Sequence, residues 1–310
     1  MITALCGGVG GSKLVLGLYR VLPPDTLRVA VNTADDLTLW GLHVSPDLDT
    51  VTYTLAGVAQ RELGCGIEGD TFGALEGLRS LGEDTWFHVG DRDLATHIYR
   101  SHALNRGETL TEITAHIAPQ LGVRAQILPM TNGTVSTRLL AGDRWLEFQE
   151  YFVRERHALP VDEVRFAGVE SVRPTDAVIN ALRDAEVLVL VNSNPVLSIL
   201  PILAVPGLRE TIESSGLPRV AVSPFVGAGS VAGPAGELMR LTGRPPTSAG
   251  LAALYRGLID GIVIARGDED QAPQIESMGI GVLVTDTIMR SDADRERLAS
   301  ETLTFARGLR

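Results

Sequence analysis

The sequence predicts an α/β protein, built as a Rossmann-like parallel sheet with helices on both faces and an inserted smaller α+β lobe. First, the chain opens with an apolar run, a glycine-rich turn, a helical pattern and a second apolar run, the order of a βαβ unit. Second, short apolar runs ending in polar loops return after residue 186. Third, the region between them is rich in strand-like segments joined by a Gly-Asp turn. We therefore expect a core of residues 1–93 and 173–310 and a lobe of residues 94–172.

The composition limits the class of protein. Hydrophobic residues make up 45% of the 310 residues and aromatic residues only 5%, which fits a core of aliphatic side chains. The net charge of −11 argues against a general nucleic-acid surface, although backbone dipoles can still bind a small phosphorylated ligand. Cys6 and Cys65 lack CxxC spacing, and neither a signal peptide nor an apolar run of about 20 residues is present. We expect a reduced, cytoplasmic protein without a membrane or nucleic-acid partner.

The opening βαβ unit predicts a phosphate-binding turn. Residues 1–6 and 27–31 are expected strands, and helically spaced apolar residues follow the turn GGVGGSK. The turn is not a dinucleotide fingerprint, because Lys13 replaces its last glycine. It is not a Walker A loop either, because Ser12 precedes Lys13. What remains is a row of small residues whose N–H groups can approach an anion at a helix start, with a plain tight turn as the alternative.

Acidic residues gather shortly after this turn. Asp36, Asp47 and Asp49 could face a metal ion. Asp and Pro disfavour strand interiors, so residues 45–49 should be a loop or a helix start, and helical apolar spacing follows from residue 50. A carboxylate beside anion-binding backbone suggests a site where a metal bridges protein and phosphate.

Polar loops follow three predicted strands, at the end where open α/β sheets bind ligands. Asp91 and Arg92 follow an expected strand at residues 86–89, with a capped helix and a local ion pair as the alternative. The strands at residues 187–191 and 220–222 end in loops of Ser, Asn, Gly and Pro, which suit backbone contacts to a ligand.

The remaining elements complete the expected architecture. Helices are expected at residues 75–81, 111–121 and 293–310, and strands at residues 125–128, 135–140, 145–151, 164–167, 261–264 and 282–284. A hairpin turn is expected at Gly142-Asp143. The spacing of four histidines does not suggest a metal site, and each is expected at the surface or at a helix cap: His97, His102, His116 and His157.

These segments together resemble the 2-phospho-L-lactate transferase family, which makes the deazaflavin coenzyme F-420. The matching pieces are GGVGGSKL, NTADD, SPDLDTVTYTLAG, GDTF, GDRDLATHIYR, LPM, FQEYFV, SNPVLSILPILAVPG, SPFVGAGSVAGPAGELM and TDTIM. They run from residue 2 to about residue 289, and SPDLDTVTYTLAG and SNPVLSILPILAVPG are long and specific.

The resemblance implies a reaction and its partners. A guanosine-diphosphate-linked donor carries a three-carbon phosphoacid, which is transferred to the side-chain hydroxyl of 7,8-didemethyl-8-hydroxy-5-deazariboflavin (FO), and GMP leaves. Mg²⁺ is required, and such enzymes are often homodimers. The phosphoacid is left open between phospholactate, phosphoenolpyruvate and phosphoglycerate.

The resemblance also implies site residues. Asp49, helped by Asp36, is expected to hold Mg²⁺ and to be catalytic, and Asp49 could instead orient or deprotonate the acceptor hydroxyl. Asp49 and Arg92 are expected to contact the deazaflavin. The donor is expected to meet the glycine turn and two later loops, through Gly7, Gly8, Gly10, Gly11, Ser12, Lys13, Ser193, Asn194, Ser223 and Gly227.

Three positions depart from many relatives. Val9 stands where they have Thr, Cys65 where they have Trp, and Asn192 where they have Pro. The missing aromatic at Cys65 bears on stacking with the deazaflavin, and Asn192 borders the nucleotide loop and bears on donor recognition.

Two other functions fit the residues less well. A non-catalytic regulatory relative of the same superfamily would be expected to lack the PDLDT and GDRD residues, and both motifs are present. An NAD-dependent oxidoreductase is disfavoured by Lys13 and by Asn32, which stands where an acidic ribose ligand is expected.

Overall fold

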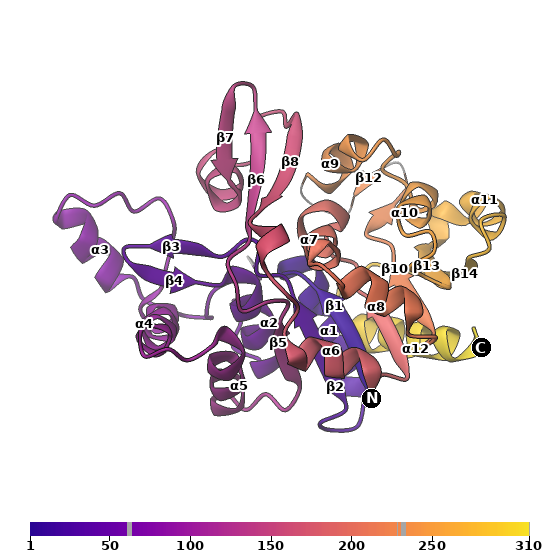
Figure 1. Ribbon diagram of the computed structural model, residues 1–310, viewed down its shortest axis with the longest axis horizontal. Coiled ribbons are helices and arrows are strands. Elements are labelled where there is room, and N and C mark those ends of the chain that lie inside the picture. The colour runs from indigo at the N-terminus through magenta and orange to yellow at the C-terminus, as the bar shows by residue number, and fades with distance from the viewer. Residues whose placement is uncertain (61–63, 228, 231–233, 310) are drawn as a thin grey trace.

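A seven-stranded parallel sheet forms the centre of the protein (Figure 1). The computed structural model describes residues 1–60, 64–227, 229–230 and 234–309. The strand order is β14-β13-β10-β9-β1-β2-β5, and every neighbouring pair is parallel. The strands are β1 (Ile2–Cys6), β2 (Leu27–Val31), β5 (Gln126–Pro129), β9 (Val187–Leu190), β10 (Arg219–Val222), β13 (Gly261–Ala265) and β14 (Gly281–Thr285).

Helices cover both faces of this sheet, as the sequence predicts. Successive strand residues point to opposite faces, so Ala4 and Cys6 pack into one apolar cluster and Leu5 into the other. The first face is covered by α1 (Val9–Val21), α2 (Pro46–Ala56), α5 (Leu110–Gln120) and α12 (Asp292–Gly308). The second face is covered by α6 (Asp176–Arg183), α7 (Leu200–Ala204), α8 (Leu208–Ser214), α10 (Ser248–Leu254) and α11 (Ala272–Glu276).

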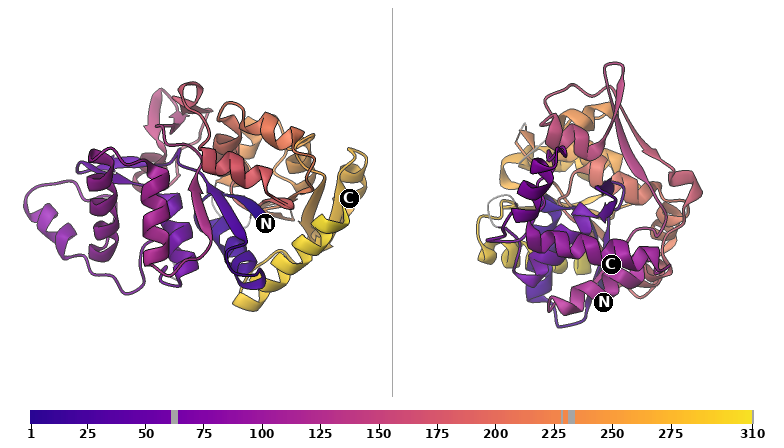
Figure 2. Two further views of the ribbon diagram at one scale, coloured as in Figure 1. Left: turned by 60° about the horizontal axis from the view of Figure 1, so that its bottom comes forward. Right: turned by 90° about the vertical axis from the view of Figure 1, so that its left-hand side faces the viewer.

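A smaller three-stranded antiparallel sheet stands out from the main sheet (Figures 1 and 2). Its order is β7-β6-β8, formed by β6 (Ser136–Ala141), β7 (Arg144–Glu147) and β8 (Glu163–Ala167), and Gly142-Asp143 joins the first two strands as expected. The strand expected at residues 125–128 does not belong to this sheet. As β5 it pairs with β2, because Ile127 and Leu128 bury their side chains on opposite faces of the main sheet. The division into a core and a lobe of residues 94–172 stays an expectation.

One predicted strand is absent, and another is shorter than predicted. Residues 86–89 form no strand, because Trp86 packs edge-on against Phe87 and under the guanidinium of Arg154, not beside another strand. The strand expected at residues 145–151 ends at Glu147, and the chain then turns into a short π-helix, η1 (Glu150–Arg154), which buries Tyr151.

The other described elements connect or flank these layers. They are β3 (Leu37–Leu39), β4 (Leu42–Val44), α3 (Gly73–Ser80), α4 (Asp91–Asn105), η2 (Val169–Ser171), η3 (Pro195–Ile199), β11 (Phe225–Val226), β12 (Gly229–Ser230), α9 (Ala235–Leu241) and η4 (Arg266–Gln271). In the described part of the chain, no single helix is long and apolar enough to cross a membrane. One pair, Pro195–Ala204 with Leu208–Ser214, meets the criterion of length and composition only when joined, and it is bent by 87°.

Helices α1 and α12, which lie side by side in Figure 2, approach each other closely at Gly17. A Cβ atom at this position would overlap the backbone carbonyl of Arg295, which cannot swing away as a side chain would. Gly77 in α3 has no atom near its would-be Cβ and is therefore a matched control.

We expect Gly17→Ala to lower the free energy of unfolding by about 1–3 kcal/mol, because the two helices must separate. Gly77→Ala should leave the free energy unchanged or raise it by up to about 1 kcal/mol, because alanine favours a helix. Denaturant unfolding measures both. Equal effects of the two substitutions would show that the helix contact is not as close as described.

Candidate active site

The glycine turn between β1 and α1 is held by side chains from two other segments. The N–H of Gly7 donates to Ser193 Oγ at 3.0 Å, and side chains at Gly7 and Gly11 would overlap Ser198 and Ser193. A side chain at Gly8 would overlap the carboxylate of Asp47. The turn, the loop after β9 and the start of α2 therefore meet at the carboxyl end of the parallel strands, as the sequence predicts.

Three carboxylates lie beside the turn, one of them buried (Asp35) and two partly buried (Asp36 and Asp47). Asn32 Nδ2 donates to Asp35 Oδ2 and to Asp47 Oδ2, both at 3.0 Å. Asp36 Oδ2 accepts from Ser45 Oγ at 2.6 Å and lies 2.9 Å from His43 Nε2. Among the described residues, the Oδ1 atoms of Asp35 and Asp36 are buried without a hydrogen-bond partner. We call Asp35, Asp36 and Asp47 the acidic cluster.

Burial makes the charged form of these groups costly. It raises the pKa of Asp47 to about 7, with a further contribution from the charge of Asp36. Burial and the charge of Asp47 raise the pKa of Asp35, and burial raises that of Asp36 despite its contact with His43. Within the described part of the chain, Asp35 and Asp47 form no ion pair with Lys, Arg or His. Asp35 and Asp47 therefore lack a positive partner, whereas Asp36 has the imidazole of His43 beside it and the charge of Arg100 nearby.

Asp49 lies in the first turn of α2 but belongs to a different network. Both of its oxygens are held by Arg100 of α4, with Oδ2 at 3.1 Å from Nη1 and Oδ1 paired with Nη2. Burial lowers the pKa of Arg100, but the charge of Asp49, its hydrogen bond and the charge of Asp36 together outweigh this, and the net effect raises the pKa. Asp49 is therefore a neutralised carboxylate, unlike the members of the acidic cluster.

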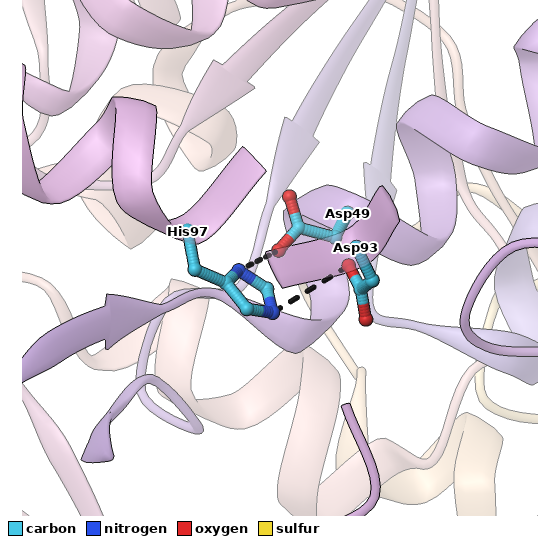
Figure 3. A group of neighbouring side chains, drawn as sticks. All are labelled: Asp49, Asp93 and His97. Carbon is cyan, nitrogen blue, oxygen red and sulfur yellow. Dashed lines mark ion pairs between the residues drawn. The ribbon is translucent and has the colours of Figure 1, made fainter. Parts of the chain in front are cut away.

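His97 and Asp93 of α4 complete this network (Figure 3). His97 Nδ1 lies 3.6 Å from Asp49 Oδ2, and Nε2 lies 3.5 Å from Asp93 Oδ1. The expectation of a surface or capping histidine was wrong here, because His97 is only 2% exposed. Asp49, Asp93 and His97 have ligand atoms within 4.8 Å of one another, as a metal site requires. The imidazole, however, lies between the carboxylates with one nitrogen toward each, which is the geometry of an ion-pair bridge.

A second part of the candidate site is a cavity beside Arg92, which lies exposed in the first turn of α4. Its side chain is 56% exposed and lies 3.6 Å from Asp70 Oδ1, whose carboxylate also accepts the N–H groups of Arg92 and Asp93. Arg92 lines a mostly apolar cavity of about 410 Å³ between α2, α4 and α5, whose wall includes the stacked rings of Tyr99 and His116.

The other predicted donor residues are placed as follows. Gly10 approaches the backbone of Asn192, Ser12 Oγ donates to the carbonyl of Val9, and Lys13 is exposed. Asn194 caps η3 by accepting the N–H groups of Val196 and Leu197, so its side chain is committed to the fold.

The second predicted nucleotide loop follows β10. Ser223 Oγ lies 2.9 Å from Ser248 Oγ, which donates to Asp268 at 3.2 Å, and the backbone of Gly227 also bonds Asp268. Residue 228 and residues 231–233 of this motif lie outside the described residues. The sequence reasoning missed Asp268, Arg100, His97 and Tyr53. The spacing of residues 93, 97 and 100 on one helix face was the signal that could have found two of them.

The raised pKa of Asp47 predicts a pH dependence of stability. The folded protein holds a proton on this carboxyl between its ordinary pKa of 3.8 and about 7, where the unfolded chain has lost it. In Mg²⁺-free buffer, the free energy of unfolding of wild type should therefore fall relative to Asp47→Asn as the pH rises from about 4 to about 7, and level off above. Urea unfolding at a series of pH values measures this. If the free energies of unfolding of wild type and Asp47→Asn differ by the same amount at every pH, the raised pKa of Asp47 is contradicted.

Comparison with known proteins shows the family of the chain. The family model described as 2-phospho-L-lactate transferase CofD matches residues 2–302. The 2-phospho-L-lactate transferase of Methanospirillum hungatei is 39% identical over 304 residues, covering 98% of this chain and 99% of its own. The phosphoenolpyruvate transferase of Streptomyces coelicolor is 38% identical over 315 residues, covering 100% and 99%.

A solved structure shows the same fold. A member of the UPF0052 family from Bacillus halodurans superposes with a TM-score of 0.65 over 97% of this chain and 98% of its own, at 16% identity. That likeness concerns the fold alone. The relatives and the family match over nearly the whole length carry the assignment, and the chain belongs to the 2-phospho-L-lactate transferase CofD family.

Proposed function

We propose that the protein transfers a phosphoacid from a GDP-linked donor to the side-chain hydroxyl of FO and releases GMP, in coenzyme F-420 biosynthesis. The observation that carries this proposal is the meeting of the glycine turn with the acidic cluster at the carboxyl end of the sheet, where Asp35 and Asp47 form no ion pair within the described part of the chain. Curated relatives named 2-phospho-L-lactate transferase and phosphoenolpyruvate transferase support it. The phosphoacid is phospholactate, phosphoenolpyruvate or phosphoglycerate.

The residues present fit a magnesium ion. Mg²⁺ prefers carboxylate oxygens and water, and the acidic cluster offers buried oxygens on Asp35 and Asp36 that have no hydrogen-bond partner in the described structure. We propose Asp36 as the first ligand. Asp49 joins it only when Arg100 releases one of its oxygens, because both are now held. When bound, the ion neutralises charge on the donor's phosphates.

The chain's own residues then bind and orient the substrates. The N–H groups in the first turn of α1 receive the donor's phosphates, since those of Gly7 and Gly8 already bond Ser193 and Asp47. The acceptor oxygen attacks the phosphorus that carries the phosphoacid, and the bond between this phosphorus and the GMP oxygen breaks. We propose that Asp49 orients the acceptor hydroxyl and takes its proton. GMP leaves toward the loops after β9 and β10.

The acceptor's ring system needs an apolar surface near Arg92. The cavity of about 410 Å³ beside Arg92 is mostly apolar and is lined by Tyr53 and Tyr99, which suits a flat heteroaromatic ring. The Arg92 guanidinium at its edge can donate to a ring carbonyl or to a deprotonated ring oxygen.

The reaction itself is tested by incubating the protein with FO, Mg²⁺ and each of the three GDP-linked donors. We expect coupled product and GMP with at least one donor, and no product in excess EDTA. Asp49→Asn should reduce turnover by several orders of magnitude, because the group that takes the hydroxyl proton is lost. Asp36→Asn should raise the Mg²⁺ concentration needed for half-maximal rate by more than about 10-fold.

Asp143→Asn is the matched control, because that carboxylate is exposed at the tip of the β6–β7 hairpin. Near-wild-type turnover of Asp49→Asn would remove Asp49 from the reaction. No product with any donor, from folded protein in the presence of Mg²⁺, would overturn the proposed function.

The acceptor site is tested separately with Arg92→Ala. We expect the dissociation constant for FO to rise about 10-fold or more, because a charged hydrogen bond worth about 1.5–3 kcal/mol is lost. Fluorescence titration of FO measures it. Arg106→Ala, which removes an exposed arginine at the other end of α4, should leave the constant unchanged. Equal affinities for wild type and Arg92→Ala would place the ring elsewhere.

A further inference from the structure

Helices α2 and α4 face each other through buried polar side chains, although two neighbouring helices normally pack apolar residues between them. Asp49 and Tyr53 lie one turn apart on α2, and Asp93, His97 and Arg100 lie on one face of α4. Their exposed fractions range from 1% to 9%. Replacing such a set with apolar residues is often neutral or stabilising, so stability alone gives a weak reason for it.

The contacts form one continuous chain from Asp49 to Tyr53. Arg100 Nη1 lies 3.1 Å from Asp49 Oδ2 and 3.3 Å from His97 Nδ1, so one guanidinium nitrogen touches both groups. On the other side of the ring, His97 Nε2 lies 3.5 Å from Asp93 Oδ1. Tyr53 donates its hydroxyl to that same oxygen at 2.8 Å and is therefore the far anchor of the chain.

The His97 ring lies between two carboxylates, with Nδ1 toward Asp49 and Nε2 toward Asp93 (Figure 3). Nε2 is buried without a hydrogen bond of its own in the described structure, and the Asp93 oxygen that it faces at 3.5 Å is held by the Tyr53 hydroxyl, so this edge is anchored by charge and packing. The side chain of Asp49 has little conformational freedom, because Arg100 donates hydrogen bonds to both of its oxygens. Arg100 is itself held in place by its contact with His97 Nδ1. A reacting carboxylate must be held to about half an ångström, and supporting contacts of this kind provide that precision.

We propose that His97 is a positioning residue, which uses its Nδ1 edge and Arg100 to set the direction of the Asp49 carboxylate toward the acceptor hydroxyl. The inference rests on the proposed function, since it concerns how Asp49 meets its substrate. His97 itself touches no substrate. The Nδ1 edge carries the effect, and the Nε2 edge serves as its anchor.

Two substitutions of His97 distinguish the contribution of the Nδ1 edge from that of the Nε2 edge. The amide of His97→Asn reaches about as far as Nδ1 and can contact Arg100 and Asp49, whereas the amide of His97→Gln reaches as far as Nε2 and can contact only Asp93. We expect kcat to fall about 10- to 100-fold in His97→Gln, with the KM of the donor unchanged. It should fall clearly less in His97→Asn, which keeps the Nδ1 contacts and loses only the anchor. His102→Gln, an exposed histidine on the same helix, is the control and should match wild type.

Equal kcat values for wild type and both variants would overturn the proposal. An equal fall of kcat in His97→Asn and His97→Gln would also overturn it. Should either variant fail to fold, Tyr53→Phe removes only the hydroxyl that anchors the chain. It should lower kcat with an unchanged donor KM, and an unchanged kcat would contradict the proposal.

A readout independent of turnover separates this inference from the proposed function. In crystal structures, the Asp49 carboxylate should rotate in His97→Gln and keep its direction in His97→Asn. An inactive wild type would defeat the proposed function, whereas an unrotated Asp49 in His97→Gln would defeat the positioning role even if wild type is active.

Discussion

The confinement of three carboxylates beside a backbone turn is the constraint on which the site depends. Asp35 is buried and Asp36 and Asp47 are partly buried, and the hydrogen bonds from Asn32, Ser45 and His43 leave the Oδ1 atoms of Asp35 and Asp36 without a partner in the described structure. Withdrawing carboxylates from water is costly unless protons or a cation compensate their charge. This requirement is the physical basis of the proposal that a divalent cation binds beside the glycine turn.

In the same region, Asp49 differs from Asp35 and Asp47 because it has a positively charged partner. Four residues further along the chain than Ser45, it is neutralised by Arg100 and braced through His97 against a second helix. Two classes of carboxylate therefore lie within one helical turn of α2: Asp47, uncompensated and suited to a cation, and Asp49, compensated and held in direction. This contrast is what the proposed reaction requires: the acidic cluster would bind a cation, and through it the donor's phosphates, while Asp49 would serve the acceptor hydroxyl.

The fold was largely predictable because the strands of a parallel sheet are buried on both faces and read as short apolar runs, as in β1, β2, β9 and β10. The glycine turn and the helix start at Pro46 were predictable from local backbone preferences. The strand at residues 86–89 was wrongly predicted because aromatic residues are typical of strands. In the structure, Trp86 instead packs against Phe87 and under the guanidinium of Arg154. The partners of Asp49 were missed because they depend on how α4 packs against α2. The spacing of Asp93, His97 and Arg100 marks one face of α4, but it does not say which helix that face meets.

The most direct test of the acidic cluster is the position of a bound cation. Crystals of wild type grown with GDP and Mn²⁺, a substitute for Mg²⁺ with a usable anomalous signal, would locate the ion without reference to activity. The acidic cluster predicts a peak within bonding distance of a carboxylate oxygen of Asp36, beside the glycine turn. A peak between Asp49, Asp93 and His97, or none despite bound GDP, would contradict it.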